Sequence, residues 1–364
     1  MKFAEVRRSD LDCYRAIAII GVVSVHCSQQ FLVDFPKFRD TVPEFILNIQ
    51  SLGLNGLFLF FVLSGYLIEE LYGFNRDTFS VRRFFVSRFA RISPLWFIFF
   101  FVGAIQFIVL KDGPWINAGV EMSFRHLFSV IFLSSTFTLF FAPKWWNVIV
   151  YGGASIQTEI QFYLIFPFLR KVSSGLLWKV SIPILVFDIL SKLAEQQIIH
   201  GIPRLFVGIL ERSGFLTYLP FFIVGIYLSR VHHKQSVKIL VVLFWLMLIR
   251  PTHFWYTFSA VIYFLFAYVI VKIQLHLNLA LRLSKVISIT SYFVFFVHFQ
   301  VLMVIDFLPF EDFTNQISGN VLIYFLFFLL YFILVMLTSV LIGMFSWKYI
   351  EHPVIRLGKR RNGH

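Results

Sequence analysis

NVLIYFLFFLLYFILVMLTSVLIGMFS, residues 320–346, is the stretch of this sequence that decides its fold. None of its residues is charged. Roughly 17 to 25 apolar residues are enough for a helix to cross the hydrocarbon core of a bilayer. The stretch therefore predicts a transmembrane helix, and similar runs recur along the whole chain.

The composition of the chain supports residence in a membrane. Of 364 residues, 59% are hydrophobic and only 14% are charged, whereas soluble domains carry about a quarter charged residues. A chain this apolar does not have enough polar residues to cover its whole surface in water, so part of that surface must face lipid. Cys13 and Cys27 would lie about 21 Å apart along one straight helix, so we expect two reduced thiols rather than a disulfide.

The apolar runs predict an all-α, polytopic bundle of about ten transmembrane helices. The first run follows Lys2, Arg7 and Arg8, as a secretion signal would. No small-residue cleavage pattern closes it and further spans follow, so we interpret it as the first span. The predicted spans are 13–31, 51–73, 92–110, 156–170, 175–194, 213–230, 238–250, 254–272, 286–307 and 320–346.

The placement of lysine and arginine orients this bundle, because cytoplasmic loops carry an excess of them. With ten spans and the N-terminus inside, the inside segments hold 23 of the 32 basic residues and the outside segments hold 9. An eleventh crossing at 126–141 would invert every later loop and spoil this bias. We therefore predict a re-entrant or interfacial helix at 126–141 and cytoplasmic positions for both termini.

The chain is predicted to form one membrane-embedded domain over residues 1–364, with a short basic tail at about 347–364 and no appended soluble domain. The net charge of +13 follows from this topology and is not the footprint of a nucleic-acid-binding protein. We expect the basic tail to contact anionic lipid. No Walker or dinucleotide glycine pattern is present, and we expect no metal site.

Ionisable residues inside a span indicate function, because lipid disfavours them. Arg15 and His26 lie on the first span, eleven positions apart, so they share a helix face about 16 Å apart along the axis. With Arg15 at the cytoplasmic edge, His26 lies near or beyond the middle of the membrane. The structural alternatives are a snorkelling anchor for Arg15 and a packed, hydrogen-bonded histidine for His26.

Three further residues carry the charge expected of a functional site. Arg88 and Arg91 form an Arg-x-x-Arg pair where the third span begins, and together they are suited to holding phosphate. Ordinary basic flanking of a span is the alternative. Glu159, at the start of the fourth span, is suited to accepting a proton or orienting a histidine, and pairing with an arginine is its structural alternative.

Other polar residues at the depth of the membrane are weaker candidates. His298 is about as deep as His26, and a purely structural role for it is equally open. Asp188 and Asp306 also lie within spans, with Asp306 near an outer end. Ser64 and Gly65 form a small pair that favours close helix packing, and no base for Ser64 stands at a readable spacing.

Several segments together resemble one family, the membrane acyltransferase 3 family of acyl-CoA-dependent sugar O-acyltransferases. The similar segments are Leu11-Asp12-Cys13-Tyr14-Arg15-Ala16-Ile17-Ala18-Ile19 leading to His26, Phe60-Phe61-Val62-Leu63-Ser64-Gly65-Tyr66-Leu67-Ile68, Arg83-Phe84-Phe85-Val86-Ser87-Arg88-Phe89-Ala90-Arg91-Ile92-Ser93-Pro94-Leu95, Glu159-Ile160-Gln161-Phe162-Tyr163, Ser291-Tyr292 with His298, and Ile350-Glu351-His352-Pro353. Their order covers about residues 10 to 357. The chain departs from the family pattern where Ala154-Ser155-Ile156-Gln157 replaces the usual Trp-Ser-x-Ser, where Cys13-Tyr14 replaces Gly-Leu, and at Phe58.

The resemblance implies an enzyme that transfers an acyl group from cytoplasmic acyl-CoA to a hydroxyl of a cell-surface or lipid-linked glycan. On family grounds this acyl group is expected to be acetyl. The resemblance implies that Arg15, Arg88 and Arg91 hold the phosphates of CoA. It also implies that His26 is the central catalytic group, as general base on the acceptor hydroxyl or as a transiently acylated nucleophile. Glu159 is then the candidate to orient His26 or to assist proton transfer.

The implied location is the bacterial cytoplasmic membrane, and the implied partners are acyl-CoA, a glycan and membrane lipid, without nucleic acid. The alternative function is a transporter or flippase for a glycan or its precursor. Such a protein would favour an internal inverted repeat, which the sequence does not show.

Overall fold

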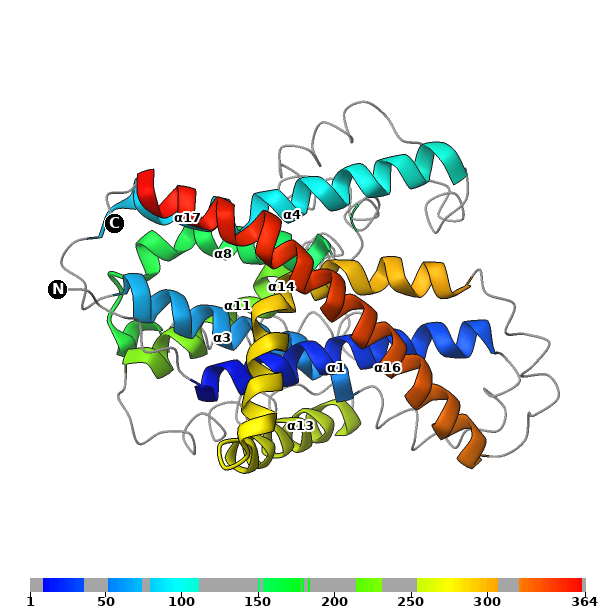
Figure 1. Ribbon diagram of the computed structural model, residues 1–364. Coiled ribbons are helices and arrows are strands. Elements are labelled where there is room, and N and C mark those ends of the chain that lie inside the picture. Colours follow the sequence, from blue (N-terminus) through cyan, green and yellow to red (C-terminus); the bar gives the residue numbers. More distant parts are fainter. Residues whose placement is uncertain are drawn as a thin grey trace, which may run out of the picture. The chain divides into compact units, whose positions relative to one another are not determined.

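The computed structural model describes residues 9–35, 52–73, 79–110, 150, 153–177, 179, 183, 214–230, 254–306 and 321–361. All regular secondary structure in these ranges is helical and none of it is strand, which confirms the all-α prediction for the described part of the chain (Figure 1). Helices are expected in lipid because they satisfy their backbone polar groups internally.

The chain divides into two compact units, which we describe one at a time. Unit 1 comprises Met1–Leu63 and Trp255–Trp347, and unit 2 comprises Ser64–Phe254 and Lys348–His364. The helices of unit 1 are α1 (Ser9–Asp34), the 3₁₀ turn η2 (Leu52–Leu54), the first part of α3 (Asn55–Tyr72), α13 (Phe254–Gln274), α14 (Asn278–Asp306) and α16 (Val321–Ser346). Those of unit 2 are the rest of α3, α4 (Val81–Leu110), α8 (Gly153–Leu169), α11 (Gly214–Arg230) and α17 (His352–Arg361), which follows the π-helical turn Trp347–Glu351.

Most described helices coincide with predicted spans, and two of them begin two turns or more earlier than predicted. Helix α4 begins at Val81 rather than at 92, and α14 begins at Asn278 rather than at 286. Both extensions are rich in basic residues, which are good helix formers outside lipid. Among the described residues, four helices are long and apolar enough to cross a membrane: Ser9–Asp34, Val81–Gly103, Asn278–Ile305 and Val321–Leu357.

The predicted spans 175–194 and 238–250 lie largely or wholly outside the described residues, as does the predicted re-entrant segment 126–141. The total of ten spans and the cytoplasmic position of the termini therefore stay predictions.

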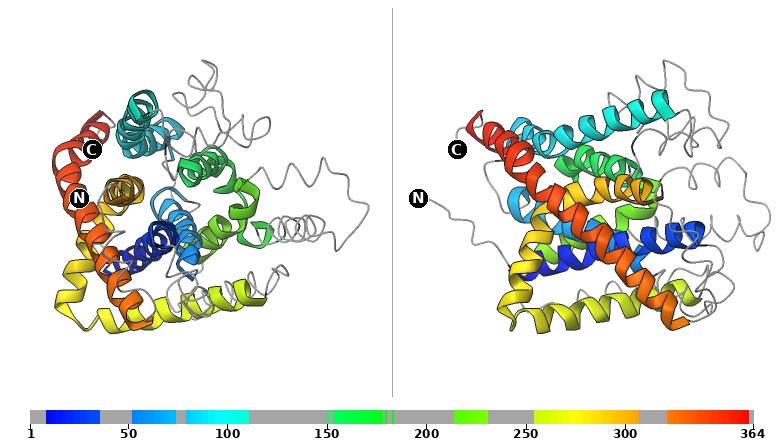
Figure 2. Two further views of the ribbon diagram at one scale, coloured as in Figure 1. Left: turned by 90° about the vertical axis from the view of Figure 1, so that its right-hand side faces the viewer. Right: turned by 45° about the vertical axis from the view of Figure 1, so that its right-hand side comes forward.

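Helix α1 is the core of unit 1, where it packs against α14 and α16 (Figure 2). It has buried residues on all sides, as a helix surrounded by other helices should. At its start, the buried Asp12 carboxylate accepts a 2.7 Å hydrogen bond from the Ser288 hydroxyl of α14. Near its end, Phe31 packs edge-on against Tyr324 and Tyr331 of α16. The outer face of α16 exposes many leucines and other apolar side chains, which suits contact with lipid.

Helix α14 is strongly bent, as both views in Figure 2 show. Hydroxyl groups in its middle bond to the backbone of the preceding turn. Thr290 Oγ1 donates to the carbonyl of Val286 at 3.0 Å, and Ser291 Oγ donates to that of Ser288 at 2.9 Å. Such bonds compete with the helical ladder and bend helices. His298 follows these hydroxyl residues by about two turns of the same helix.

Glycines allow α1 to approach the start of α3 at backbone distance. A Cβ at Gly56 would collide with the carbonyl oxygen of Ala18, and one at Gly53 would collide with the carbonyl oxygen of Gly21. The Tyr263 hydroxyl of α13 donates a 2.8 Å hydrogen bond to the carbonyl of Ile17 at the same place. This contact holds the middle of α1 in one position within unit 1.

In unit 2, α3 packs closely on α11 through the small residue that the sequence singled out. A Cβ at Gly65 would collide with the backbone carbonyl of Phe222, so the close packing predicted for the Ser64-Gly65 pair is observed. Beside it, the rings of Phe222 and Phe162 stack with centroids 4.0 Å apart. The stack joins α11 to α8.

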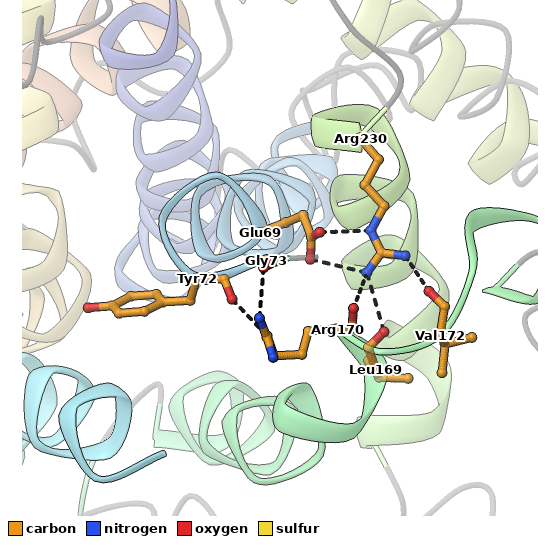
Figure 3. Close-up of polar contacts among 7 residues, drawn as sticks. All are labelled: Glu69, Tyr72, Gly73, Leu169, Arg170, Val172 and Arg230. Carbon is orange, nitrogen blue, oxygen red and sulfur yellow. Dashed lines mark hydrogen bonds and ion pairs between the residues drawn. The ribbon is translucent and has the colours of Figure 1, made fainter. Parts of the chain in front are cut away.

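Arg230, the last residue of α11, joins three helix ends (Figure 3). Its Nε lies 2.7 Å from Glu69 Oε1 of α3, and both side chains are almost fully buried. The same guanidinium donates to the carbonyls of Leu169, Arg170 and Val172 at the end of α8. Carbonyls at the end of a helix lack the N–H partners of the helix interior, although that of Leu169 also accepts from the Val172 N–H at 3.0 Å. A cation is favourable at this negative end of a helix.

Arg170 makes the reciprocal contact at the end of α3. It donates to the carbonyls of Tyr72 and Gly73 at 3.0 and 3.1 Å, and its guanidinium lies over the ring of Phe79. We call Glu69, Arg170 and Arg230 the carboxyl-end clamp. It brings the C-terminal ends of α3, α8 and α11 to one place. The ten-span prediction puts these three ends on the same side of the membrane, whereas a crossing at 126–141 would put those of α8 and α11 on the side opposite to that of α3.

The clamp predicts that Glu69→Gln destabilises the protein. The substitution leaves the buried Arg230 without its counterion, and removing one partner of a buried pair costs about 3 kcal/mol or more. We expect the thermal midpoint of the detergent-solubilised protein to fall by several degrees. Lys171→Gln is the matched control, since Lys171 is exposed and adjacent to the clamp. An unchanged midpoint for Glu69→Gln would contradict the importance of the pair.

Candidate functional site

Chemistry-bearing side chains gather at two places in the described part of the chain, one in each unit. The first lies on α1 in unit 1, where Arg15 and His26 are both half-buried. Their neighbours on the helix are mostly buried apolar residues. The polar face predicted from their spacing is therefore present on an otherwise packed helix.

His26 is paired with a second histidine, His298 of α14. The distance from His26 Nδ1 to His298 Nε2 is 2.9 Å, and the ring planes are inclined by only 12°. His298 has no exposed surface. The ring of Phe299 packs against both, with centroids 4.5 Å from His26 and 4.1 Å from His298.

The hydrogen-bond chain continues beyond this pair. His298 Nδ1 lies 2.8 Å from the carbonyl oxygen of Val294, one turn earlier on α14. Both ring nitrogens of His298 are thus engaged, one with His26 and one with the backbone. A half-buried imidazole held by a fully buried one is an arrangement that can take up and return a proton.

In unit 2, Arg88 lies between two tyrosine rings instead of projecting from the helix as a flanking charge. Its side chain is buried, and its guanidinium carbon is 5.3 Å from the centroid of Tyr72 and 5.9 Å from that of Tyr163. The Tyr72 hydroxyl donates to Ser87 Oγ at 3.0 Å. Such cation–π contacts favour the charge over the ring faces.

One nitrogen of the Arg88 guanidinium lacks a hydrogen-bond partner in the described part of the chain. This nitrogen, Nε, is buried. Arg91, one turn further on, is half-buried, and Tyr163 lies within electrostatic range of both arginines. An unpaired buried donor costs roughly 1–3 kcal/mol, so an anion bound here would relieve an existing penalty.

Glu159 is buried on α8 beside this group. Its Oε1 accepts hydrogen bonds from Tyr163, one turn later, and from Ser64 of α3 at 3.2 Å. Its Oε2 has no hydrogen-bond partner in the described ranges. Ser64 therefore has a carboxylate acceptor that its sequence neighbourhood did not reveal.

The structure brings together some predicted residues and leaves other relations as predictions. It places Arg88, Arg91 and Glu159 in unit 2, and Arg15 and His26 in unit 1. Orientation of His26 by Glu159 stays a prediction, because each residue is described only within its own unit. The departure from the family pattern at Gln157 leaves a buried amide whose Oε1 lacks a partner among the described residues.

Sequence reasoning missed the partners of the site residues, with one exception. The four-residue step from Glu159 to Tyr163 is readable, since such pairs meet on one helix face. The contact of His26 with His298 spans 272 positions, and no local signal announces it. Asp188 lies outside the described residues, and the side chain of Asp306 is also not described.

Comparison with known proteins agrees with this picture. A family model described as an acyltransferase domain, that of the acyltransferase 3 family, matches residues 8–344. Acyltransferase MdmB of Streptomyces mycarofaciens is 29% identical over 182 residues, which cover 48% of this chain and 43% of that protein. Putative peptidoglycan O-acetyltransferase YrhL of Bacillus subtilis (strain 168) is 26% identical over 175 residues, 43% of this chain and 23% of that protein.

The matched part of the chain thus spans less than half the length of either relative. No solved structure matches the chain significantly. The family match is far more extensive, since it covers nearly the whole sequence and includes both groups of site residues. Together with the long apolar helices, it shows that the chain is a multi-pass membrane protein that belongs to the acyltransferase 3 family.

Proposed function

We propose that the protein transfers an acyl group, in the simplest case acetyl, from cytoplasmic acyl-CoA to a hydroxyl of a cell-surface or lipid-linked glycan. The observation that carries the proposal is the imidazole of His26, which is half-buried on a membrane helix and hydrogen-bonded to a buried partner. Attack of a hydroxyl on a thioester needs a base of this kind, because the hydroxyl proton must leave as the new bond forms.

The donor site is proposed at the arginines. The buried Arg88 has an unpartnered Nε in the described part of unit 2, and the neighbouring Arg91 adds a second charge. Guanidinium groups bind phosphates through paired hydrogen bonds, so the phosphates of CoA suit this group. Arg15, at the predicted cytoplasmic edge of α1, is proposed to add a third contact.

The acceptor and the location are proposed with support from the relatives. One relative carries the name of a putative peptidoglycan O-acetyltransferase, which favours an acceptor in the cell envelope. Both relatives come from bacteria, which favours the cytoplasmic membrane of a bacterium. Glu159, with one oxygen lacking a partner among the described residues, is proposed to assist proton transfer or to orient the base.

We expect His26→Ala to abolish acyl transfer, because it removes the group that accepts the hydroxyl proton. The measurement uses purified full-length protein, radiolabelled acetyl-CoA and a glycan acceptor, and follows both thioester loss and labelled sugar. Expression and membrane insertion of the variant should match wild type. Cys27→Ser, next to His26 on the same helix, is the control for local disturbance, and acyl transfer by His26→Ala at the wild-type rate would refute the role of the base.

We expect Arg88→Lys to raise the KM for acetyl-CoA by about tenfold or more, because it removes a charged hydrogen bond of roughly 1.5–3 kcal/mol. Lysine keeps the charge but not the planar fork of donors. Arg82→Lys is the matched control, since Arg82 is exposed on the same helix. A lower thermal midpoint with an unchanged KM would show that Arg88 is only structural.

A further inference from the structure

We propose that His298 is the positioning residue of the acyl transfer, and that it sets the tautomer of His26 so that Nε2 is the basic atom. The inference rests on the function proposed above. It names the atom that reacts and assigns a role to a residue for which the sequence left a structural role equally open.

The first step is the bond between His298 and the backbone. The carbonyl oxygen of Val294 can only accept, so the hydrogen of this 2.8 Å contact belongs to Nδ1 of His298. The donor and acceptor of this bond are therefore known without first assuming a tautomer for His298. It ties the ring of His298 to the preceding turn of α14.

The second step is the state of the other nitrogen of His298. The ring has no exposed surface. In the described ranges its hydrogen bonds go to the backbone of Val294 and Phe295 and to His26, and none goes to a carboxylate. A buried imidazolium without a counterion is strongly disfavoured. His298 is therefore neutral, and its Nε2 carries a lone pair that accepts.

The third step determines which ring nitrogen of His26 carries the hydrogen. The 2.9 Å contact joins His298 Nε2 to His26 Nδ1, so the hydrogen in it belongs to Nδ1 of His26. In the neutral ring only one nitrogen carries hydrogen. The lone pair of His26 therefore lies on Nε2, the nitrogen that points away from His298.

The packing around the pair holds this arrangement. Phe299 contacts both rings, and the ring planes of the two histidines are nearly parallel. Turning the His26 ring over would break the bond to His298 and leave a fully buried nitrogen unpaired. Second partners of this kind fix the tautomer and the orientation of a reactive imidazole.

The transfer then proceeds through one atom. His26 Nε2 takes the proton of the acceptor hydroxyl as the hydroxyl oxygen attacks the thioester carbon. The carbon–sulfur bond breaks, and the thiolate of CoA takes the proton back from Nε2, so that an ester and free CoA result. While His26 is protonated, its Nδ1–H donates to a neutral nitrogen as a charged and therefore stronger hydrogen bond. If His26 is instead acylated transiently, the same Nε2 lone pair is the nucleophile.

The test compares two substitutions of His298 in the full-length protein. His298→Gln keeps an acceptor toward His26, whereas His298→Leu has none. We expect kcat to fall by about 100-fold or more in His298→Leu, within the range seen when a positioning partner is lost, with the KM for acetyl-CoA unchanged. His298→Gln should remain within about tenfold of wild type. Val297→Ala, which changes buried packing next to His298 on α14 and removes no hydrogen bond, is the packing control and should stay close to wild type.

A spectroscopic measurement tests the same inference in the unaltered protein. In protein labelled with ¹⁵N-histidine, the His26 resonances are assigned by their loss in His26→Ala. We expect a protonated Nδ1 and an unprotonated Nε2 for His26 in the neutral state. This readout decides the matter even if both His298 variants fail to fold, and the opposite tautomer would overturn the inference.

Equal kcat values for His298→Leu and wild type would also overturn the positioning role, as would equal losses in folded His298→Leu and His298→Gln. Failure of the proposed function gives a different result. Activity that survives in His26→Ala refutes His26 as the base, whereas activity lost in His26→Ala but kept in His298→Leu refutes only the role of His298.

Discussion

Every polar group that leaves water in a membrane protein needs a partner inside the protein, because lipid provides none. This constraint explains the helical fold and also the polar contacts between helices. Asp12 has Ser288, Glu69 has Arg230, and His298 has the Val294 carbonyl. Each pair joins segments or turns that hydrophobic packing alone would leave free to slide or rotate.

The same constraint gives meaning to the groups that lack partners in the described part of unit 2. Arg88 Nε, Gln157 Oε1 and Glu159 Oε2 are buried there with unused hydrogen-bonding capacity. Unit 1 shows the opposite pattern around His298, where both ring nitrogens are engaged. One region thus has buried groups to which a bound group could supply the missing partners, while the other has its histidine ring held by contacts within the protein.

The sequence predicted what depends on local pattern. Helices α1, α11 and α16 follow from long apolar runs, and the shared face of Arg15 and His26 follows from helical spacing alone. The predicted starts of α4 and α14 come too late, because Arg82 and Arg83 in α4, and Arg282 and Lys285 in α14, interrupt the apolar pattern without ending the helix.

The contacts that define the site could not be predicted, since they depend on how helices far apart in the chain come together. Nothing near His26 identifies His298 as its partner, and nothing near Glu69 identifies Arg230. Ser64 appeared to have no base because Glu159 is brought to it only by the packing of α8 against α3. The family motifs marked these residues without showing which of them touch.

The carboxyl-end clamp also constrains how the protein is made. Arg230 follows Glu69 by 161 positions, so at about 5–20 residues per second the ribosome needs roughly 10–30 s to supply it. During that interval α3 must enter the membrane on the strength of its apolar residues, with the Glu69 carboxyl still lacking its arginine. The ion pair therefore forms late in biogenesis, once α11 has been synthesised. It stabilises the packed helices and does not contribute to the insertion of α3.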